Sequence, residues 1–166
     1  MILALAVWLA LWFPVAAQAP ATAPAPSVTV PKPSATATCP VCGMFVAKYP
    51  QWVATVVWRD GATVHFDGAK DLFTYVLQLK KYAPGRDAKD MVTIAVTEFY
   101  DLRTIDAREA YYVVGSDVLG PMGREFIPLA TKSDANEFLR DHDATGILRF
   151  ADVSPKVVRD VDEGRR

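Results

Sequence analysis

The chain is short of the residues that build most metal and disulfide frameworks. Among its 166 residues it has only two cysteines, Cys39 and Cys42, and two histidines, His65 and His142. One pair of cysteines cannot form the multiple bridges of a small disulfide-rich scaffold. A structural zinc site would have to recruit all four residues, although neither histidine is close to the cysteines in the sequence.

The chain also has no excess of positive charge. The chain has 18 Lys and Arg residues against 19 Asp and Glu residues, which gives a formal net charge of -1. A nucleic-acid partner usually requires a basic face, so this balance argues against one. Hydrophobic residues make up 51% of the chain, enough for one domain with a real core or for two small modules that share one.

The N-terminal region has the features of an export signal. Residues 1–15 are almost wholly apolar, and Ala17-Gln18-Ala19 follows as a small-x-small site. This pattern predicts a signal peptide over residues 1–19, cleaved after Ala19, and a periplasmic protein. The apolar run is short for a membrane span and is interrupted by Pro14, but an uncleaved membrane anchor is the alternative. No cysteine closely follows the run, so no lipid attachment is expected.

Composition divides the remainder of the chain into three parts. Residues 20–38 are rich in Ala, Pro, Thr and Ser, which predicts an extended, mobile linker without a core. The folded domain is expected over residues 39–153. Residues 154–166 are highly charged and are expected to form a frayed tail.

Within the domain, hydrophobic patterning predicts the same order of elements twice. Each half reads as two strands, an amphipathic helix and a third strand, so the expected class is α+β with two β-β-α-β units packed together. The first unit covers about residues 51–98 and the second about residues 110–151. Asp67 is a candidate cap for the first helix, and Pro128 suggests an edge strand in the second unit. The expected strands are 51–58, 62–66, 91–97, 110–114, 125–129 and 147–151, and the expected helices are 69–80 and 132–141.

The segment Cys39-Pro40-Val41-Cys42-Gly43-Met44 places three sulfur atoms within six residues. Soft sulfur ligands select Cu(I), zinc or iron–sulfur centres. A disulfide across Cys-x-x-Cys would close a very small loop and constrain little of the unfolded chain. Covalent haem is excluded because Gly43, not histidine, follows the second cysteine.

Besides a zinc site, two interpretations of this segment remain. A thiol–disulfide oxidoreductase using Cys39 and Cys42 fits the spacing, but such motifs normally sit at a helix N-terminus, and strands are expected here. Copper(I) is the other reading, since it accepts few ligands and prefers thiolate and thioether sulfur. Met122 lies in a Gly-Pro-Met-Gly loop of the second unit and is a candidate to meet Met44 across the two units. A gap-filling role in the core is the commoner fate of a methionine.

These residues resemble the NosL family of copper-binding accessory proteins for nitrous oxide reductase maturation. The resemblance is carried by residues 39–46, by Val64-His65-Phe66-Asp67-Gly68, and by Gly120-Pro121-Met122-Gly123 with Pro128 after it. It covers about residues 39–152. The fold it implies is two β-β-α-β units, similar to part of the organomercurial lyase (MerB) fold.

The resemblance also implies a site and a role. Cys42 would bind one Cu(I) per chain as a thiolate, with Met44 and Met122 as thioether ligands and Cys39 as a candidate additional thiolate. His65 and Asp67 match a stretch near the site, and structural roles are expected for both. The implied role is a non-enzymatic chaperone that delivers copper to nitrous oxide reductase together with an ABC-type maturation complex.

Overall fold

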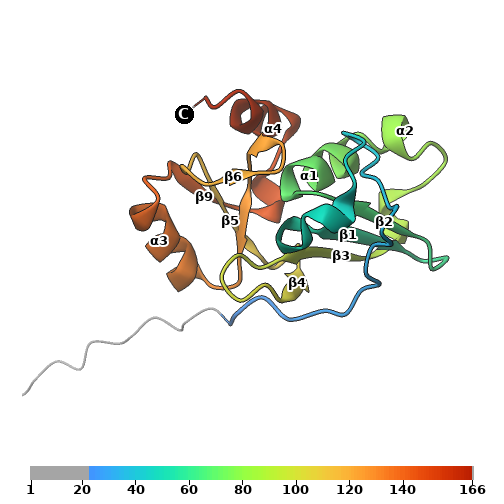
Figure 1. The fold of residues 1–166 in the computed structure, drawn as a ribbon, viewed down its shortest axis with the longest axis horizontal. Coiled ribbons are helices and arrows are strands. Elements are labelled where there is room, and N and C mark those ends of the chain that lie inside the picture. The colour runs from blue at the N-terminus through green and yellow to red at the C-terminus, as the bar shows by residue number, and fades with distance from the viewer. Residues whose placement is uncertain (1–22, 166) are drawn as a thin grey trace, which may run out of the picture.

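The computed structural model describes residues 23–165, so the predicted signal peptide lies outside the described part of the chain. The class is α+β, as expected, with antiparallel sheets and helices packed against them (Figure 1). No helix within residues 23–165 combines the length and the apolar character needed to cross a membrane.

The first unit is built on a four-stranded antiparallel sheet in the order β2-β1-β3-β4. β-Branched residues dominate these strands, as is typical of half-buried pleated surfaces. The turn between β1 and β2 contains Asp60 and Gly61, and Gly61 takes the left-handed conformation (φ +83°) that the Asp-Gly pair predicts. The strands are β1 (Ala54–Trp58), β2 (Thr63–Phe66), β3 (Met91–Thr97) and β4 (Thr104–Asp106).

The second unit repeats this topology with a three-stranded sheet in the order β8-β5-β9. In both units the first strand, β1 or β5, is central and pairs with the next two strands of its unit, so the predicted repeat is confirmed. Pro128 lies in β8, which is an edge strand as its sequence suggested. The strands are β5 (Tyr111–Val114), β8 (Ile127–Leu129) and β9 (Gly146–Arg149).

Each unit has one main helix, α1 (Ala69–Leu77) or α3 (Lys132–Asp141). The helix expected over residues 69–80 is interrupted at Gln78, whose ψ of 41° ends α1 before the short α2 (Leu79–Tyr82). Thr131 caps α3 by accepting a hydrogen bond from Asp134 N. The 3-10 helices are η1 (Val46–Lys48), η2 (Pro50–Trp52), η3 (Ala88–Asp90) and η4 (Phe150–Asp152).

The two units share a core through the aromatic ring of Phe73 on α1. This ring lies 4.9 Å from Tyr112, 5.0 Å from Phe126 and 5.2 Å from Phe150, measured between centroids. All three partners belong to the second unit. The position of α1 is therefore fixed by packing against the second sheet as well as its own.

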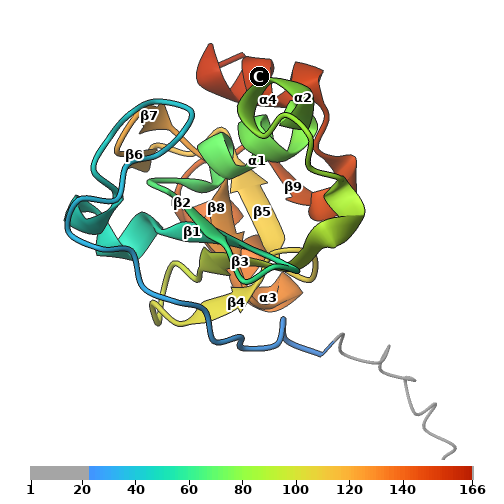
Figure 2. The same cartoon turned by 90° about the vertical axis from the view of Figure 1, so that its right-hand side faces the viewer.

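Residues 23–38 differ from the expected mobile linker. They run along the edge of the domain as an extended strap (blue in Figures 1 and 2). Val28 N donates to Thr104 O at 3.0 Å, and Ser27 forms a β-bridge with Ile105 of β4. Ala25, only 2% exposed, donates from its backbone to Ala130 O at 2.8 Å in the second unit. The strap is ordered because β4 offers unpaired edge groups, a partner that composition cannot reveal.

The C-terminal residues also differ from the expected frayed tail. They form α4 (Pro155–Asp162), which begins with a cap in which Ser154 Oγ accepts from Val157 N. Val161 is buried, and α4 packs against α1. The charged residues that suggested a tail lie on the exposed side of an amphipathic helix.

A small hairpin that the sequence did not predict follows β5. It consists of β6 (Leu119–Gly120) and β7 (Gly123–Arg124), with Pro121 and Met122 at its turn. Gly123 has a φ of +85°, which suits the tight connection.

Candidate metal centre

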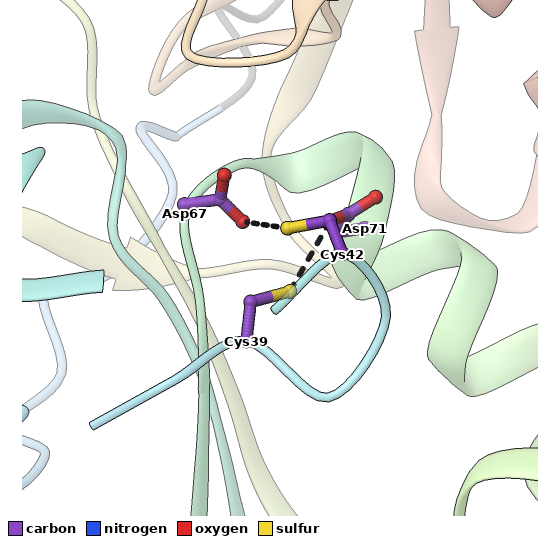
Figure 3. A group of neighbouring side chains, drawn as sticks. All are labelled: Cys39, Cys42, Asp67 and Asp71. Carbon is purple, nitrogen blue, oxygen red and sulfur yellow. Dashed lines mark hydrogen bonds between the residues drawn. The ribbon is translucent and has the colours of Figure 1, made fainter. Parts of the chain in front are cut away.

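Two thiols and two carboxylates converge at the start of α1. The side chains of Cys39, Cys42, Asp67 and Asp71 each bring one donor atom into a group whose members all lie within 4.8 Å of one another. Figure 3 shows both sulfur atoms, from the loop before η1, facing the two carboxylates. Among the described residues, these four side chains form the one group of Cys, His, Asp and Glu that could hold a metal ion.

The loop that carries the cysteines is held in a tight turn. Gly43 N donates to Cys39 O at 2.9 Å, and Cys39 N donates to Met44 O at 2.9 Å. Gly43 adopts a φ of +80°, a conformation that favours glycine. The turn brings the two sulfur atoms to the same side of the loop, toward α1.

The carboxylates come from the junction of β2 and α1. Asp67 follows β2 directly, and Asp71 is one helical turn further on, so the two side chains lie on the same face. Asp67 is not the cap of α1, contrary to the sequence expectation. The N-cap is Gly68, and Asp67 Oδ1 accepts a hydrogen bond from Cys42 Sγ at 3.1 Å instead.

The second thiol is paired in the same way. Cys39 Sγ donates to Asp71 Oδ2 at 3.2 Å, and both residues are buried. Burial raises the pKa of the Cys39 thiol well above that of a free cysteine, and it also raises the pKa of Asp71. Burial, assisted by the Asp71 carboxylate, raises the pKa of Cys42 to about 12. Both cysteines are therefore protonated thiols at neutral pH when no metal is bound.

The donor set suits a thiophilic metal ion. Asp67 is 1% exposed, and its Oδ2 atom has no hydrogen-bond partner within the described residues. A buried oxygen without a partner is costly and is expected to acquire one. The two thiols can lose their protons to become anionic soft ligands, and the carboxylates beside them can accept those protons.

The structure places the two methionines of the predicted site differently. Met44 is half-buried and lies in the cysteine loop itself. Met122 is 46% exposed at the turn of the β6–β7 hairpin, so it is not a core methionine. Its carbonyl oxygen accepts a hydrogen bond of 3.1 Å from Lys70 Nζ, and Lys70 directly precedes Asp71. The hairpin is thus anchored at the same end of α1 as the cluster, while thioether coordination by Met44 and Met122 stays a prediction.

Neither histidine belongs to the cluster. His65 lies on β2, where its Nδ1 is 3.0 Å from Thr55 Oγ1, and burial lowers its pKa. His142 follows α3 and pairs with Asp117 at 2.8 Å. The structural zinc reading that needed all four Cys and His side chains is therefore wrong.

Sequence reasoning missed Asp71 and gave Asp67 only a structural role. The sequence signal that could have identified both residues is the spacing of Asp67 and Asp71, four residues apart, at a strand-to-helix junction just after His65. Such a pair is common on solvated helix faces. What distinguishes this one is its burial under the cysteine loop, which depends on tertiary packing.

Two β-β-α-β units, with paired thiols and carboxylates at the start of α1 in the first unit, define a candidate thiolate metal-binding protein. Comparison with protein families gives the particular family. The chain belongs to the NosL family, whose model matches residues 30–158.

Two relatives support this assignment. The copper-binding lipoprotein NosL of Stutzerimonas stutzeri is 29% identical over 126 residues, which cover 74% of this chain and 64% of that protein. The match thus spans less than two thirds of the relative's length. The crystal structure of the copper chaperone NosL from Shewanella denitrificans superposes with a TM-score of 0.65 and 23% identity, over 79% of this chain and 99% of the other. At that identity the likeness shows the fold, and the expected α+β architecture is confirmed.

Proposed function

We propose that this protein is a non-enzymatic copper carrier that binds one Cu(I) ion as cargo and releases it to a partner by ligand exchange. The observation that carries the proposal is the convergence of Cys39 and Cys42 on Asp67 and Asp71. Thiols held next to proton acceptors can become thiolates when a soft metal arrives. Copper binding by the relative from S. stutzeri supports the choice of metal.

In the proposed site, Cys42 supplies a thiolate, and Met44 and Met122 supply neutral thioethers. Cys39 is a candidate additional thiolate. As the copper–sulfur bond forms, the Cys42 S–H bond breaks, and its proton leaves to solvent by way of Asp67, the acceptor of its hydrogen bond. In transfer, a ligand of the partner attacks the copper from the exposed side, where Met122 lies, and the Cys42 sulfur is reprotonated as copper leaves.

The proposed location is the periplasm, and the proposed recipient is nitrous oxide reductase, reached together with an ABC-type maturation complex. These partners rest on family membership. The alternative, a thiol–disulfide oxidoreductase using Cys39 and Cys42, is disfavoured by the protonation of the thiols. Oxidoreductases lower the pKa of the attacking cysteine, whereas burial raises the pKa of both cysteines here.

The test is a competition titration against a Cu(I)-specific chelator under anaerobic conditions. Cys42→Ala, Met44→Ala and Met122→Ala are each expected to weaken Cu(I) binding by at least about tenfold, since each removes a ligand. Met91→Leu is the matched control, because Met91 is a buried residue of β3 away from the cluster. Parent-like affinity in Cys42→Ala would refute the site.

A second measurement addresses the recipient. Copper-loaded parent protein is incubated with copper-free nitrous oxide reductase and the maturation complex, and copper in the reductase is counted after separation. Transfer above that from free Cu(I)-chelator is expected. Equal transfer from the chelator alone would refute the proposed delivery role.

A further inference from the structure

The β6–β7 hairpin is attached to the start of α1 by two buried ionisable side chains, Lys70 and Glu125. Lys70 Nζ donates to Met122 O at 3.1 Å, across 52 residues of sequence. In the opposite direction, Glu125 Oε1 accepts from Lys70 N at 2.5 Å and from Phe126 N at 2.9 Å. The hairpin is thus held at its turn by Lys70 and at its C-terminal end by Glu125.

Glu125 occupies a space that two glycines leave open. A Cβ atom at Gly68, the N-cap of α1, would overlap the Glu125 carboxylate, and a Cβ at Gly120 of β6 would lie 3.1 Å from Glu125 Cγ. Close approach of the two backbones around this carboxyl group therefore favours glycine on both sides, most strongly at Gly68. The contact fixes the hairpin directly against residues 67–71, which carry the two carboxylates of the cluster.

Lys70 connects a third element to the same point. Its Nζ also donates to Asp162 Oδ1 of α4 at 2.6 Å. The Lys70 side chain is 7% exposed, whereas that of Asp162 is 63% exposed. One ammonium group thus joins α1, the hairpin and the C-terminal helix.

Lysine and glutamate are among the side chains least often buried, because desolvating their charges is costly. Neither Lys70 nor Glu125 belongs to the cluster of thiols and carboxylates. Within the described residues, the Lys70 ammonium contacts the Met122 carbonyl and Asp162 of α4. The Glu125 carboxyl group contacts the backbone N–H groups of Lys70 and Phe126.

We propose that Lys70 and Glu125 are positioning residues that hold Met122 toward the thiol–carboxylate cluster, so that copper affinity depends on both although neither is a ligand. This inference rests on the proposed function, since it assumes that Met122 binds the copper cargo. Met122 is 46% exposed and would be free to swing away if the hairpin were not anchored. The anchor on the Met122 carbonyl restricts that movement of the hairpin.

The test is a double-mutant cycle on Cu(I) affinity, measured by chelator competition. Lys70→Met and Glu125→Ala are each expected to weaken binding about tenfold in the parent, and to have no further effect in a Met122→Ala background. Glu125→Gln retains an oxygen acceptor of the same shape and is expected to bind copper as the parent does. Lys80→Met and Glu137→Gln are the controls, because both residues are exposed.

Asp162→Asn provides a milder test in case Lys70→Met or Glu125→Ala fails to fold. Asp162 is mostly exposed, so this change should leave the fold intact while weakening the hold on Lys70. A loss of affinity of at least about twofold, again absent in the Met122→Ala background, is expected. Circular dichroism and thermal unfolding confirm that each variant is folded.

Three results would overturn the inference. The first is that Lys70→Met binds copper like the parent. The second is that Lys70→Met weakens binding equally with and without Met122. The third is that Met122→Ala binds like the parent while Lys70→Met does not. Failure of the proposed function looks different, because then the parent protein itself fails to compete with the chelator for Cu(I).

Discussion

Cys42 Sγ and Asp67 Oδ1 are 3.1 Å apart, although 25 residues separate them in the sequence. This hydrogen bond joins the cysteine loop to the strand–helix junction of the first unit. The thiol of Cys39 and the carboxylate of Asp71 repeat the relationship at 3.2 Å. Each cysteine sulfur thus has its own carboxylate neighbour, and this pairing should control both the reactivity of the thiols and the pH dependence of copper binding.

Replacing Asp71 by asparagine should make the cysteines more reactive in the metal-free protein. The Asp71 carboxylate contributes to the raised pKa of both thiols, so its loss should lower these pKa values. A change of one pKa unit gives on the order of tenfold more thiolate at a fixed pH below the pKa. Alkylation of Cys42 by iodoacetamide, followed by mass spectrometry, measures the rate. Asp141→Asn on the exposed end of α3 is the control, and an unchanged rate in Asp71→Asn would contradict the assigned electrostatic role.

Copper affinity should rise with pH across the neutral range. Because the pKa of Cys42 is raised to about 12, binding Cu(I) to its thiolate must release a proton at neutral pH. The apparent affinity should then increase about tenfold per pH unit for each thiol that loses its proton. Chelator competition at several pH values gives this slope. A slope near one that is unchanged in Cys39→Ser identifies Cys42 as the sole thiolate ligand. A slope near two that falls to one in Cys39→Ser shows that both cysteines bind as thiolates. A flat profile contradicts the release of a thiol proton on copper binding.

Glu125 should make the metal-free protein less stable as the pH rises. Burial raises its pKa from 4.5 to about 8, so between these values the unfolded chain loses a proton that the folded protein retains. The free energy of unfolding should therefore fall with rising pH across that interval, by up to about 1.4 kcal/mol per pH unit, and level off above it. Asp71, whose pKa is also raised, contributes in the same direction.

Urea unfolding of the parent and of Glu125→Gln at several pH values isolates the Glu125 contribution. The amide cannot ionise, so the variant should lose less stability between about pH 5 and about pH 8 than the parent does. Parallel curves for the two proteins would show that Glu125 is ionised in the folded state.

The junction of the two units should depend on Phe73. Its ring contacts three aromatic rings of the second unit and is 1% exposed. Phe73→Ala should lower the free energy of unfolding by about 3 to 5 kcal/mol, because it leaves a cavity between the sheets. Val92→Ala, at a position that is 50% exposed, should change it by less than about 0.5 kcal/mol. Denaturant unfolding checks both values, and a small effect of Phe73→Ala would mean that the units are held together elsewhere.

The sequence alone determined the architecture of the domain. Strand patterns at residues 51–58 and 110–114, together with the amphipathic helices further along each half, predicted two β-β-α-β units, and the same order of strands is found in both sheets. Periodicity suffices here because each element has one clearly apolar face. The cysteine spacing also identified the loop where the candidate site lies. The predicted methionine ligands are not yet tested.

Only the tertiary structure decided which groups surround the sulfur atoms and how the ends of the domain are ordered. Asp71 was missed because its spacing from Asp67 also fits a solvated helix face, and its burial results from the cysteine loop that covers it. The strap of residues 23–38 and helix α4 were missed because their composition is that of mobile chain. Their order comes from partners remote in sequence: the edge of β4 for the strap, and α1 with Lys70 for α4. Local sequence patterns predict which face of a helix or strand is apolar. They do not predict which side chains from a distant segment will pack against that face.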